Sequence, residues 1–158
     1  MRIGYGYDVH RFSVDRELIL GGVNVPFHKG LMGYSDADVL IHSIIDAILG
    51  ALAKGDIGAL FPDNDDRFKD VDSRILLRKV AGILHEEEYK ICNLDTTICA
   101  EEPKLQSYIF QMRENISFDL NCNISQVSVK ATTEEGLGFT GDEEGISATA
   151  VVLIEKHK

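Results

Sequence analysis

The chain is organised around a stretch near its N-terminus, Gly6-Tyr7-Asp8-Val9-His10-Arg11-Phe12. The residue pattern over 2–11 predicts a β-strand with one face formed by Ile3, Tyr5, Tyr7 and Val9. Because successive side chains of a strand point to opposite faces, Asp8 and His10 share the other face. Their carboxylate oxygen and imidazole nitrogen suit zinc or a similar divalent ion, although a surface strand with two polar residues gives the same pattern.

A buried helix is predicted over about residues 37–53. The segment Ser35-Asp36-Ala37-Asp38 has oxygen-bearing side chains, which accept hydrogen bonds from the free N–H groups of a helix start. Apolar residues then cover most of the circumference of the helix, from Val39 to Leu52. A helix that is apolar nearly all round is a buried helix.

Asp38, His42 and Asp46 interrupt this apolar surface at intervals of four residues and form one polar stripe. Since a buried charge without partners is costly, the stripe must face polar groups. His42 is therefore a candidate third metal ligand beside Asp8 and His10, and Asp46 is a candidate hydrogen-bond acceptor for its ring. A hydrogen-bonded core histidine is the alternative for His42.

The remaining segments predict an α+β fold. Two glycines between short apolar runs predict a hairpin over residues 17–25. Further helices are expected over residues 73–88 and 103–117, with Pro103 in the first turn of the second. Strands are expected over 89–100, 126–132 and 146–154, and the strand–helix–strand order predicts a parallel pair. The expected architecture is a single mixed β-sheet with helices packed on one face, in a single domain, residues 1–158.

A glycine-rich segment, Gly136-Leu137-Gly138-Phe139-Thr140-Gly141, follows the strand at 126–132. Its spacing is that of a dinucleotide-binding loop, but such a loop must open a helix, and here Gly145 and a β-rich run follow. We therefore expect a loop in which Thr132, Thr133 and backbone N–H groups bind phosphate oxygens, with Glu135 as an oxygen ligand for magnesium. A turn whose threonines bond only local backbone groups is the alternative.

The overall composition limits the partners. Acidic residues outnumber basic ones by 26 to 16, which gives a formal net charge of −10. No Lys/Arg cluster offers a surface for nucleic acid or an anionic membrane, so neither is expected as a partner. Cys92, Cys99 and Cys122 contain no C-x-x-C pair and are expected to be free thiols in a reducing compartment. Without a signal segment or a long apolar run, a cytoplasmic protein is expected.

Several of these segments together resemble the 2-C-methyl-D-erythritol 2,4-cyclodiphosphate synthase family, which acts in the non-mevalonate pathway of isoprenoid biosynthesis. The matching stretches spread over nearly the whole chain in the order of the family: Gly6 to Phe12, Ser35 to His42, Gly55 to Gly58, Phe61 to Asp63, Ala100 to Lys104, Ala131 to Gly141, and Glu144-Gly145.

The resemblance implies a phosphorus–oxygen lyase that converts 4-diphosphocytidyl-2-C-methyl-D-erythritol 2-phosphate into the cyclic diphosphate and CMP. It implies a homotrimer around a central axis with active sites between subunits, zinc on Asp8, His10 and His42, and magnesium assisted by Glu135. The nucleophile of this reaction is an already ionised phosphate oxygen. Catalysis therefore depends on positioning and charge neutralisation rather than on an activated side chain.

The resemblance also assigns the substrate contacts, and it places Tyr34 and Thr133 at the catalytic positions. The methylerythritol phosphate end is expected at Ser35, Asp56, Ile57, Gly58, Phe61, Pro62, Asp63, Asn64 and Asp65. The cytidine diphosphate end is expected at Ala100, Glu101, Glu102, Pro103, Lys104, Leu105, Gln106, Ala131, Thr132 and Thr133. Further substrate contacts are expected from Asp8, Val9, His10, Tyr34, Glu134, Glu135 and Phe139.

Two residues depart from the family pattern. Tyr34 stands where the family usually has histidine, and a phenol donates a hydrogen bond to phosphate but carries no positive charge near neutral pH. Asp142 stands where the family usually has an arginine associated with an anion in the central cavity of the trimer, so that property is not carried over. These departures leave a catalytically weak metal- and nucleotide-binding trimer as an alternative to the cyclase. A zinc phosphohydrolase is a third hypothesis.

Overall fold

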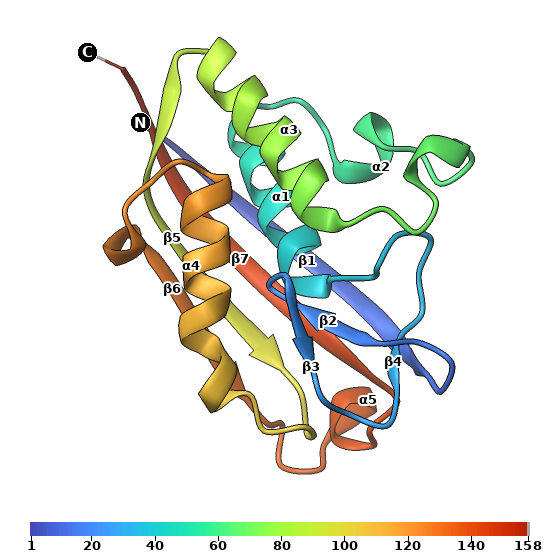
Figure 1. Cartoon of the computed structure of the whole chain (residues 1–158). Coiled ribbons are helices and arrows are strands. Elements are labelled where there is room, and N and C mark those ends of the chain that lie inside the picture. The colour runs from blue at the N-terminus through green and yellow to red at the C-terminus, as the bar shows by residue number, and fades with distance from the viewer. Residues whose placement is uncertain (158) are drawn as a thin grey trace.

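The computed structural model describes residues 1–157 and is built on one five-stranded mixed sheet (Figure 1). Its strands lie in the order β4 (Gly30–Leu31), β1 (Arg2–Ser13), β7 (Gly145–Lys156), β5 (Tyr89–Cys99) and β6 (Val127–Thr132). β7 is antiparallel to both β1 and β5, whereas β5 and β6 are parallel. The predicted mixed sheet and its parallel pair are therefore confirmed. The predicted hairpin is formed by β2 (Leu18–Leu20) and β3 (Val23–Val25).

Three long helices cover one face of the sheet, as predicted (Figure 1). α1 (Val39–Ala51) packs on β1 and β7, α3 (Ser73–Glu86) packs on α1 and β5, and α4 (Ile109–Asp119) packs on β6. The connections contain α2 (Ile57–Leu60), α5 (Gly138–Gly141) and the 3-10 turns η1 (Asp66–Phe68), η2 (Gln106–Tyr108) and η3 (Ile124–Gln126). The other face of the sheet is open, since large apolar side chains of β1 are exposed there, Ile3 by 72% and Tyr5 by 63%.

Two glycines let α1 approach β1 closely. A Cβ atom on Gly4 would lie 1.8 Å from the carbonyl oxygen of Ala47, and one on Gly6 would lie 1.9 Å from the carbonyl oxygen of Ser43. Only a residue without a side chain allows such contact between a strand and a helix backbone. The backbone of α1 therefore lies directly on β1. This close packing fixes the distance between His42 on the helix and the strand.

Asp38 determines where α1 begins. Its carboxylate accepts hydrogen bonds of 2.7–3.1 Å from the Ile41 N–H in the first turn and from the N–H groups of Gly21 and Gly22 between β2 and β3. Burial raises the pKa of Asp38 to about 7. Ala37 has a φ of 58°, outside the right-handed helical region, so the helix begins after it rather than at the predicted residue 37.

Two connections differ from the predictions. The helix expected from Pro103 begins only at Ile109, after the η2 turn. The Ala100 N–H donates to the Thr132 carbonyl, so the β5–β6 ladder extends past the end of β5 and the chain turns before it enters α4. The expected glycine-rich loop contains α5, which has only four residues and is followed by β7. The exclusion of a dinucleotide-binding helix at this position is confirmed.

Candidate metal centre and substrate cavities

Asp8, His10 and His42 meet at one point between β1 and α1. Asp8 Oδ2 lies 2.9 Å from His10 Nε2 and 3.1 Å from His42 Nδ1, and the two ring nitrogens are 3.3 Å apart. Donor atoms bound to one tetrahedral zinc ion at about 2.0–2.1 Å lie about 3.3 Å from one another. The three side chains therefore fit a divalent metal, and residues 1–157 contain no second cluster of three such donors.

The same three side chains interact strongly by charge. Burial alone would raise the pKa of Asp8, but the hydrogen bonds of His10 and His42 outweigh it and lower that pKa to about 2. Burial also acts to lower the pKa of His42, and there the hydrogen bond and negative charge of Asp8 prevail and raise it above its ordinary value. A metal that binds here therefore competes with a proton for His42.

Hydrogen bonds orient both imidazole rings. The Met32 carbonyl oxygen lies 2.8 Å from His10 Nδ1. His42 Nε2 lies 2.8 Å from Ser73 Oγ and 3.1 Å from Ser35 Oγ. Each ring thus points one nitrogen at the shared Asp8 oxygen and the other at a fixed protein group, which is the usual arrangement of metal-binding histidines.

The predicted polar stripe of α1 separates into three different environments. Asp38 caps the helix, His42 faces β1 and the start of α3, and Asp46 Oδ1 accepts a 2.8 Å hydrogen bond from the Ile57 N–H. The prediction that Asp46 accepts from the His42 ring is wrong. The second ring nitrogen points at Ser73, which belongs to a neighbouring helix, and helical spacing gives no information on that contact.

Two residues that the sequence did not predict also shape this region. The Arg16 guanidinium donates to the carbonyl oxygens of Gly33, at 2.9 Å, and Ser35, which flank Tyr34. A Cβ atom on Gly33 would lie 3.1 Å from Cε1 of the His10 ring, so this position leaves no room for a side chain. The two glycines at 30 and 33 mark a loop in the sequence, but nothing in the sequence marks Arg16.

A cavity of about 250 Å³ borders the three donors. It brings together most of the residues expected at the metal and at the methylerythritol phosphate end. Its lining consists of Asp8, His10, Gly33, Tyr34, Ser35, His42, Ile57, Gly58, Phe61, Asp63, Phe68 and Leu76. Desolvation, with the charge of nearby Asp66, raises the pKa of the Tyr34 phenol, so this side chain stays neutral and able to donate a hydrogen bond.

Five of the expected residues, Val9, Asp56, Pro62, Asn64 and Asp65, do not line this cavity. The Val9 side chain is 42% exposed on the open face of the sheet, opposite Asp8 and His10. Asp56 accepts the Ala59 N–H at the start of α2, and Asp65 forms an ion pair with Arg67. These two carboxylates are thus occupied by local contacts.

A second cavity, of about 190 Å³, lies where β5 and β6 end. It collects eight of the ten residues expected at the cytidine diphosphate end, and it shares no residue with the first cavity. Its lining consists of Ala100, Pro103, Lys104, Leu105, Gln106, Ala131, Thr132 and Thr133. Within the chain, the two predicted parts of the substrate site are therefore separate.

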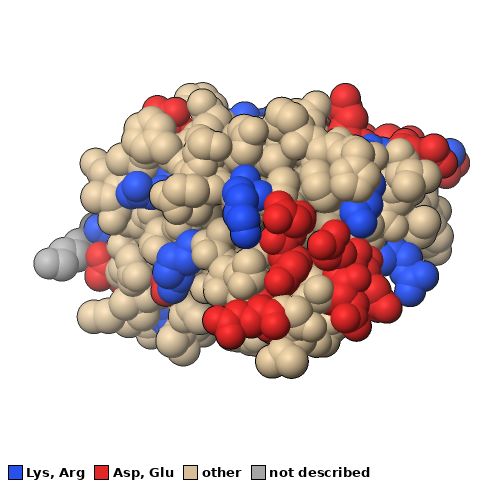
Figure 2. All heavy atoms as spheres, turned by 90° about the horizontal axis from the view of Figure 1, so that it is seen from below, with Lys and Arg blue, Asp and Glu red and all other residues tan. Residues whose placement is uncertain are grey.

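Glu101, Glu102, Glu134, Glu135 and Phe139 lie outside both cavities. Glu101 accepts the Gly136 N–H at 3.1 Å, and Glu134 accepts the Thr140 hydroxyl. Glu135 is exposed and belongs to no cluster of metal donors within residues 1–157. Figure 2 shows acidic side chains gathered over the end of the molecule that carries α5. A cation bound near this end meets a negative field.

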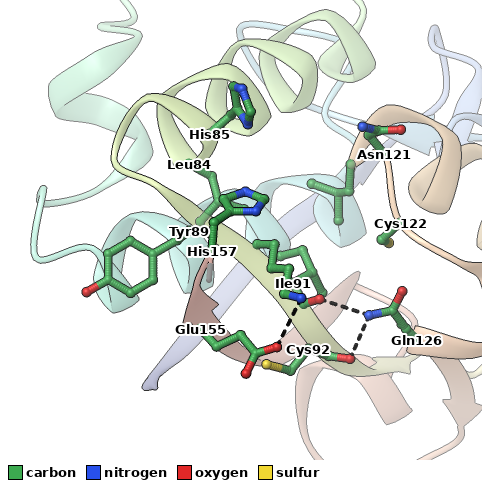
Figure 3. A pocket seen from close by; sticks show the side chains of 12 residues that line it. Leu84, His85, Tyr89, Ile91, Cys92, Asn121, Cys122, Gln126, Glu155 and His157 are labelled. Atoms are coloured by element: carbon green, nitrogen blue, oxygen red, sulfur yellow. Dashed lines mark hydrogen bonds and ion pairs between the residues drawn. The ribbon is translucent and has the colours of Figure 1, made fainter.

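A further cavity, of about 430 Å³, lies where β5 begins and β7 ends, and Figure 3 shows it from close by. Its lining includes His85, Cys92, Cys122 and His157, and none of its residues was predicted to belong to the site. Both cysteines are free thiols, and desolvation raises their pKa values. Protonated thiols are poor nucleophiles and metal ligands, so this cavity offers no comparable chemistry.

The fold and the site define the class of the protein. No helix within residues 1–157 combines the length and the hydrophobicity that crossing a membrane requires. The chain is an α+β protein in which one carboxylate and two imidazoles converge at the wall of a polar cavity. Such a centre with three protein ligands is typical of a metal-dependent enzyme.

Comparison with known proteins identifies the family. The chain belongs to the YgbB family, whose model matches residues 1–155. It is 58% identical over 156 residues to the 2-C-methyl-D-erythritol 2,4-cyclodiphosphate synthase of Syntrophomonas wolfei, covering 99% of each chain. The Plasmodium falciparum IspF–CDP complex is 38% identical, with a TM-score of 0.88 over 99% of this chain and 97% of that chain. The bifunctional IspDF of Campylobacter jejuni is 40% identical, with a TM-score of 0.95 over 99% of this chain but 42% of that longer chain.

Proposed function

We propose that this protein converts 4-diphosphocytidyl-2-C-methyl-D-erythritol 2-phosphate into 2-C-methyl-D-erythritol 2,4-cyclodiphosphate and CMP, as a cyclising phosphorus–oxygen lyase. The observation that carries the proposal is the convergence of Asp8, His10 and His42 beside a cavity. The chain in which it occurs is 58% identical, over nearly its full length, to a relative named for this reaction. In the reaction, an oxygen of the 2-phosphate attacks the β-phosphorus of the same molecule, and CMP leaves.

The proposed cofactors are zinc, which the cluster of Asp8, His10 and His42 fits, and magnesium, which the substrate phosphates would also bind. Asp8, His10 and His42 would hold zinc, and Glu135 would assist magnesium. The two ions would supply positive charge to phosphate oxygens that otherwise repel one another. The chain has a formal net charge of −10, so this contribution also offsets the repulsion between the substrate phosphates and the protein.

The side chains of the protein position the substrate. Ser35 and the neutral phenol of Tyr34 lie at the first cavity and can donate hydrogen bonds to the phosphate end. Ile57, Gly58 and Asp63 line the same cavity, and together with the rest of the segments 56–58 and 61–65 they would surround the methylerythritol phosphate end. Lys104 and Thr133 lie at the second cavity, where they can contact the diphosphate of the cytidine end. No nucleophilic side chain has to be activated, because the attacking phosphate oxygen is already ionised.

The proposal includes a homotrimer with sites between subunits, formed by residues 1–158 as one domain in the cytoplasm. Two observations support the assembly. One substrate molecule must contact both cavities, yet they share no residue within the chain. The open sheet face also exposes a row of large apolar side chains on β1, Ile3, Tyr5, Tyr7 and Val9, which an oligomer would cover. Light scattering coupled to size-exclusion chromatography should give three times the 17.5 kDa chain mass.

Turnover tests the proposal directly. The protein is incubated with the substrate, Zn²⁺ and Mg²⁺, and the products are followed by phosphorus NMR and by chromatography of CMP. The expected result is a cyclic diphosphate signal with an equal amount of CMP, and His42→Ala serves as the control. Metal-loaded protein that binds CDP but forms no product would instead make it a binding protein. Release of inorganic phosphate without a cyclic product would make it a phosphohydrolase.

A further inference from the structure

His42 has different partners on its two ring nitrogens. Nδ1 faces the metal-binding point, 3.1 Å from Asp8 Oδ2 and 3.3 Å from His10 Nε2. Nε2 faces inward, 2.8 Å from Ser73 Oγ and 3.1 Å from Ser35 Oγ. A neutral imidazole carries a hydrogen on only one nitrogen, and only the other nitrogen can bind a metal. The groups around Nε2 therefore influence whether Nδ1 is available.

The direction of the Ser73 hydrogen bond follows from Asp36. The Ser73 hydroxyl donates to Asp36 Oδ1, and the Ser73 N–H donates to Asp36 Oδ2 at 3.0 Å. A third donor, the Asp38 N–H, reaches Asp36 Oδ1 at 3.1 Å. A hydroxyl has a single hydrogen, and a carboxylate can only accept. Since the hydrogen of Ser73 is used by Asp36, its oxygen can only accept from His42 Nε2–H.

Ser35 supplies the second hydroxyl beside Nε2. Its hydroxyl oxygen accepts the Ala37 N–H at 3.2 Å and lies 3.1 Å from His42 Nε2. Both serines are buried: Ser73 has no exposed surface, and Ser35 is 8% exposed. Water therefore cannot easily replace either hydroxyl beside the ring.

We propose that Asp36 and Ser73 are positioning residues that keep the hydrogen of His42 on Nε2, so that Nδ1 is free to bind the metal. Without Asp36, the Ser73 hydroxyl is free to donate to Nε2, which stabilises the competing tautomer with its hydrogen on Nδ1. The arrangement joins the loop before α1 to the first residue of α3, which lies 31 positions after His42. The inference rests on the metal site used by the proposed function, but its test requires no turnover.

Zinc affinity, measured by competition with a chromophoric chelator, tests the proposal. Asp36→Ala and Ser73→Ala should each weaken zinc binding by about 10–100-fold, as for the loss of other outer partners of metal-binding histidines. Ser73→Thr keeps the hydroxyl and should restore most of the affinity. The matched control is Ser43→Ala, because Ser43 is also fully buried on α1, one residue from His42, but donates to the Leu40 carbonyl. Its zinc affinity should stay within about 2-fold of the wild type.

A second measurement on the unmodified protein does not depend on how the variants fold. Nitrogen-15 NMR of the zinc-loaded wild type should show His42 bound through Nδ1, with a slowly exchanging hydrogen on Nε2. Zinc bound through Nε2 would overturn the proposal, and so would wild-type affinity in Asp36→Ala. An equal loss of zinc affinity in Ser43→Ala would mean that Ser73 acts only through packing, and this would contradict its positioning role. A protein that binds zinc as expected but shows no turnover would contradict the proposed function and leave this inference standing.

Discussion

The contact between Gly6 and α1 allows a sharp test of how the fold builds the metal site. In Gly6→Ala, the new Cβ atom would lie 1.9 Å from the Ser43 carbonyl oxygen and 2.7 Å from the Ala47 nitrogen. An ordinary van der Waals contact begins at 3.4 Å, so the strand and the helix must separate by about 1.5 Å. Both obstacles are backbone atoms, so no side-chain rotation relieves the overlap.

This separation acts on the metal donors as well as on stability. His42 lies on the displaced helix one residue before Ser43, whereas Asp8 and His10 lie on the strand. Metal–ligand distances in proteins stay within about 0.2 Å of their usual values, which is far less than the required displacement. We expect the free energy of unfolding to fall by about 1–3 kcal/mol, as for other overpacked cores. Zinc affinity should fall by more than the ~10–100-fold typical of losing an outer partner.

Urea unfolding of the metal-free protein and chelator competition for zinc measure the two effects separately. Gly82→Ala is the matched control, because no atom lies within 4 Å of its Cβ position on α3. Alanine is favoured over glycine inside a helix, so this variant should gain about 0.5–1 kcal/mol and bind zinc normally. If Gly6→Ala unfolds and binds zinc like the wild type, the close approach of β1 and α1 does not determine the positions of the metal donors.

Three further changes test the site and its support. Gly33→Ala places a Cβ atom 3.1 Å from the His10 ring and should lower zinc affinity without unfolding the protein, as circular dichroism with chelator competition can check. Asp38→Ala leaves three N–H groups, two of them buried, without their acceptor and should cost about 2–4 kcal/mol in urea unfolding, whereas a cost below 1 kcal/mol would contradict the capping role. The raised pKa of His42 means that its pairing with Asp8 stabilises the metal-free fold fully below about pH 6.5 and is lost as pH rises through the raised value. Unfolding free energy without metal should therefore fall over this interval while zinc affinity rises, and a parallel rise of both would contradict the assignment. Asp8, with a pKa of about 2, should contribute no change there. Asp38, with a pKa of about 7, lowers the unfolding free energy as pH rises to about 7, so the comparison for His42 is made with the Asp38→Asn variant.

Local patterns predicted much of the fold and three candidate metal donors. Alternation along residues 2–11 placed Asp8 and His10 on one face, and the apolar surface around His42 indicated a buried helix with one polar stripe. These features depend on strand and helix periodicity, which is a property of a few consecutive residues. The parallel pair of β5 and β6 followed from the order of the elements along the chain.

The tertiary structure alone decided which groups meet across the fold. Equal spacing made Asp38, His42 and Asp46 appear as one stripe, but packing turned them toward the hairpin, the metal centre and α2. Ser73 became the partner of His42 because the start of α3 packs beside α1. The helix expected from Pro103 begins only at Ile109, because the β5–β6 ladder extends to Ala100 and the η2 turn follows. Sequence periodicity determines which face a side chain occupies. The atom it meets there depends on elements distant in the chain, and their approach is set by contacts as close as that between Gly6 and the backbone of α1.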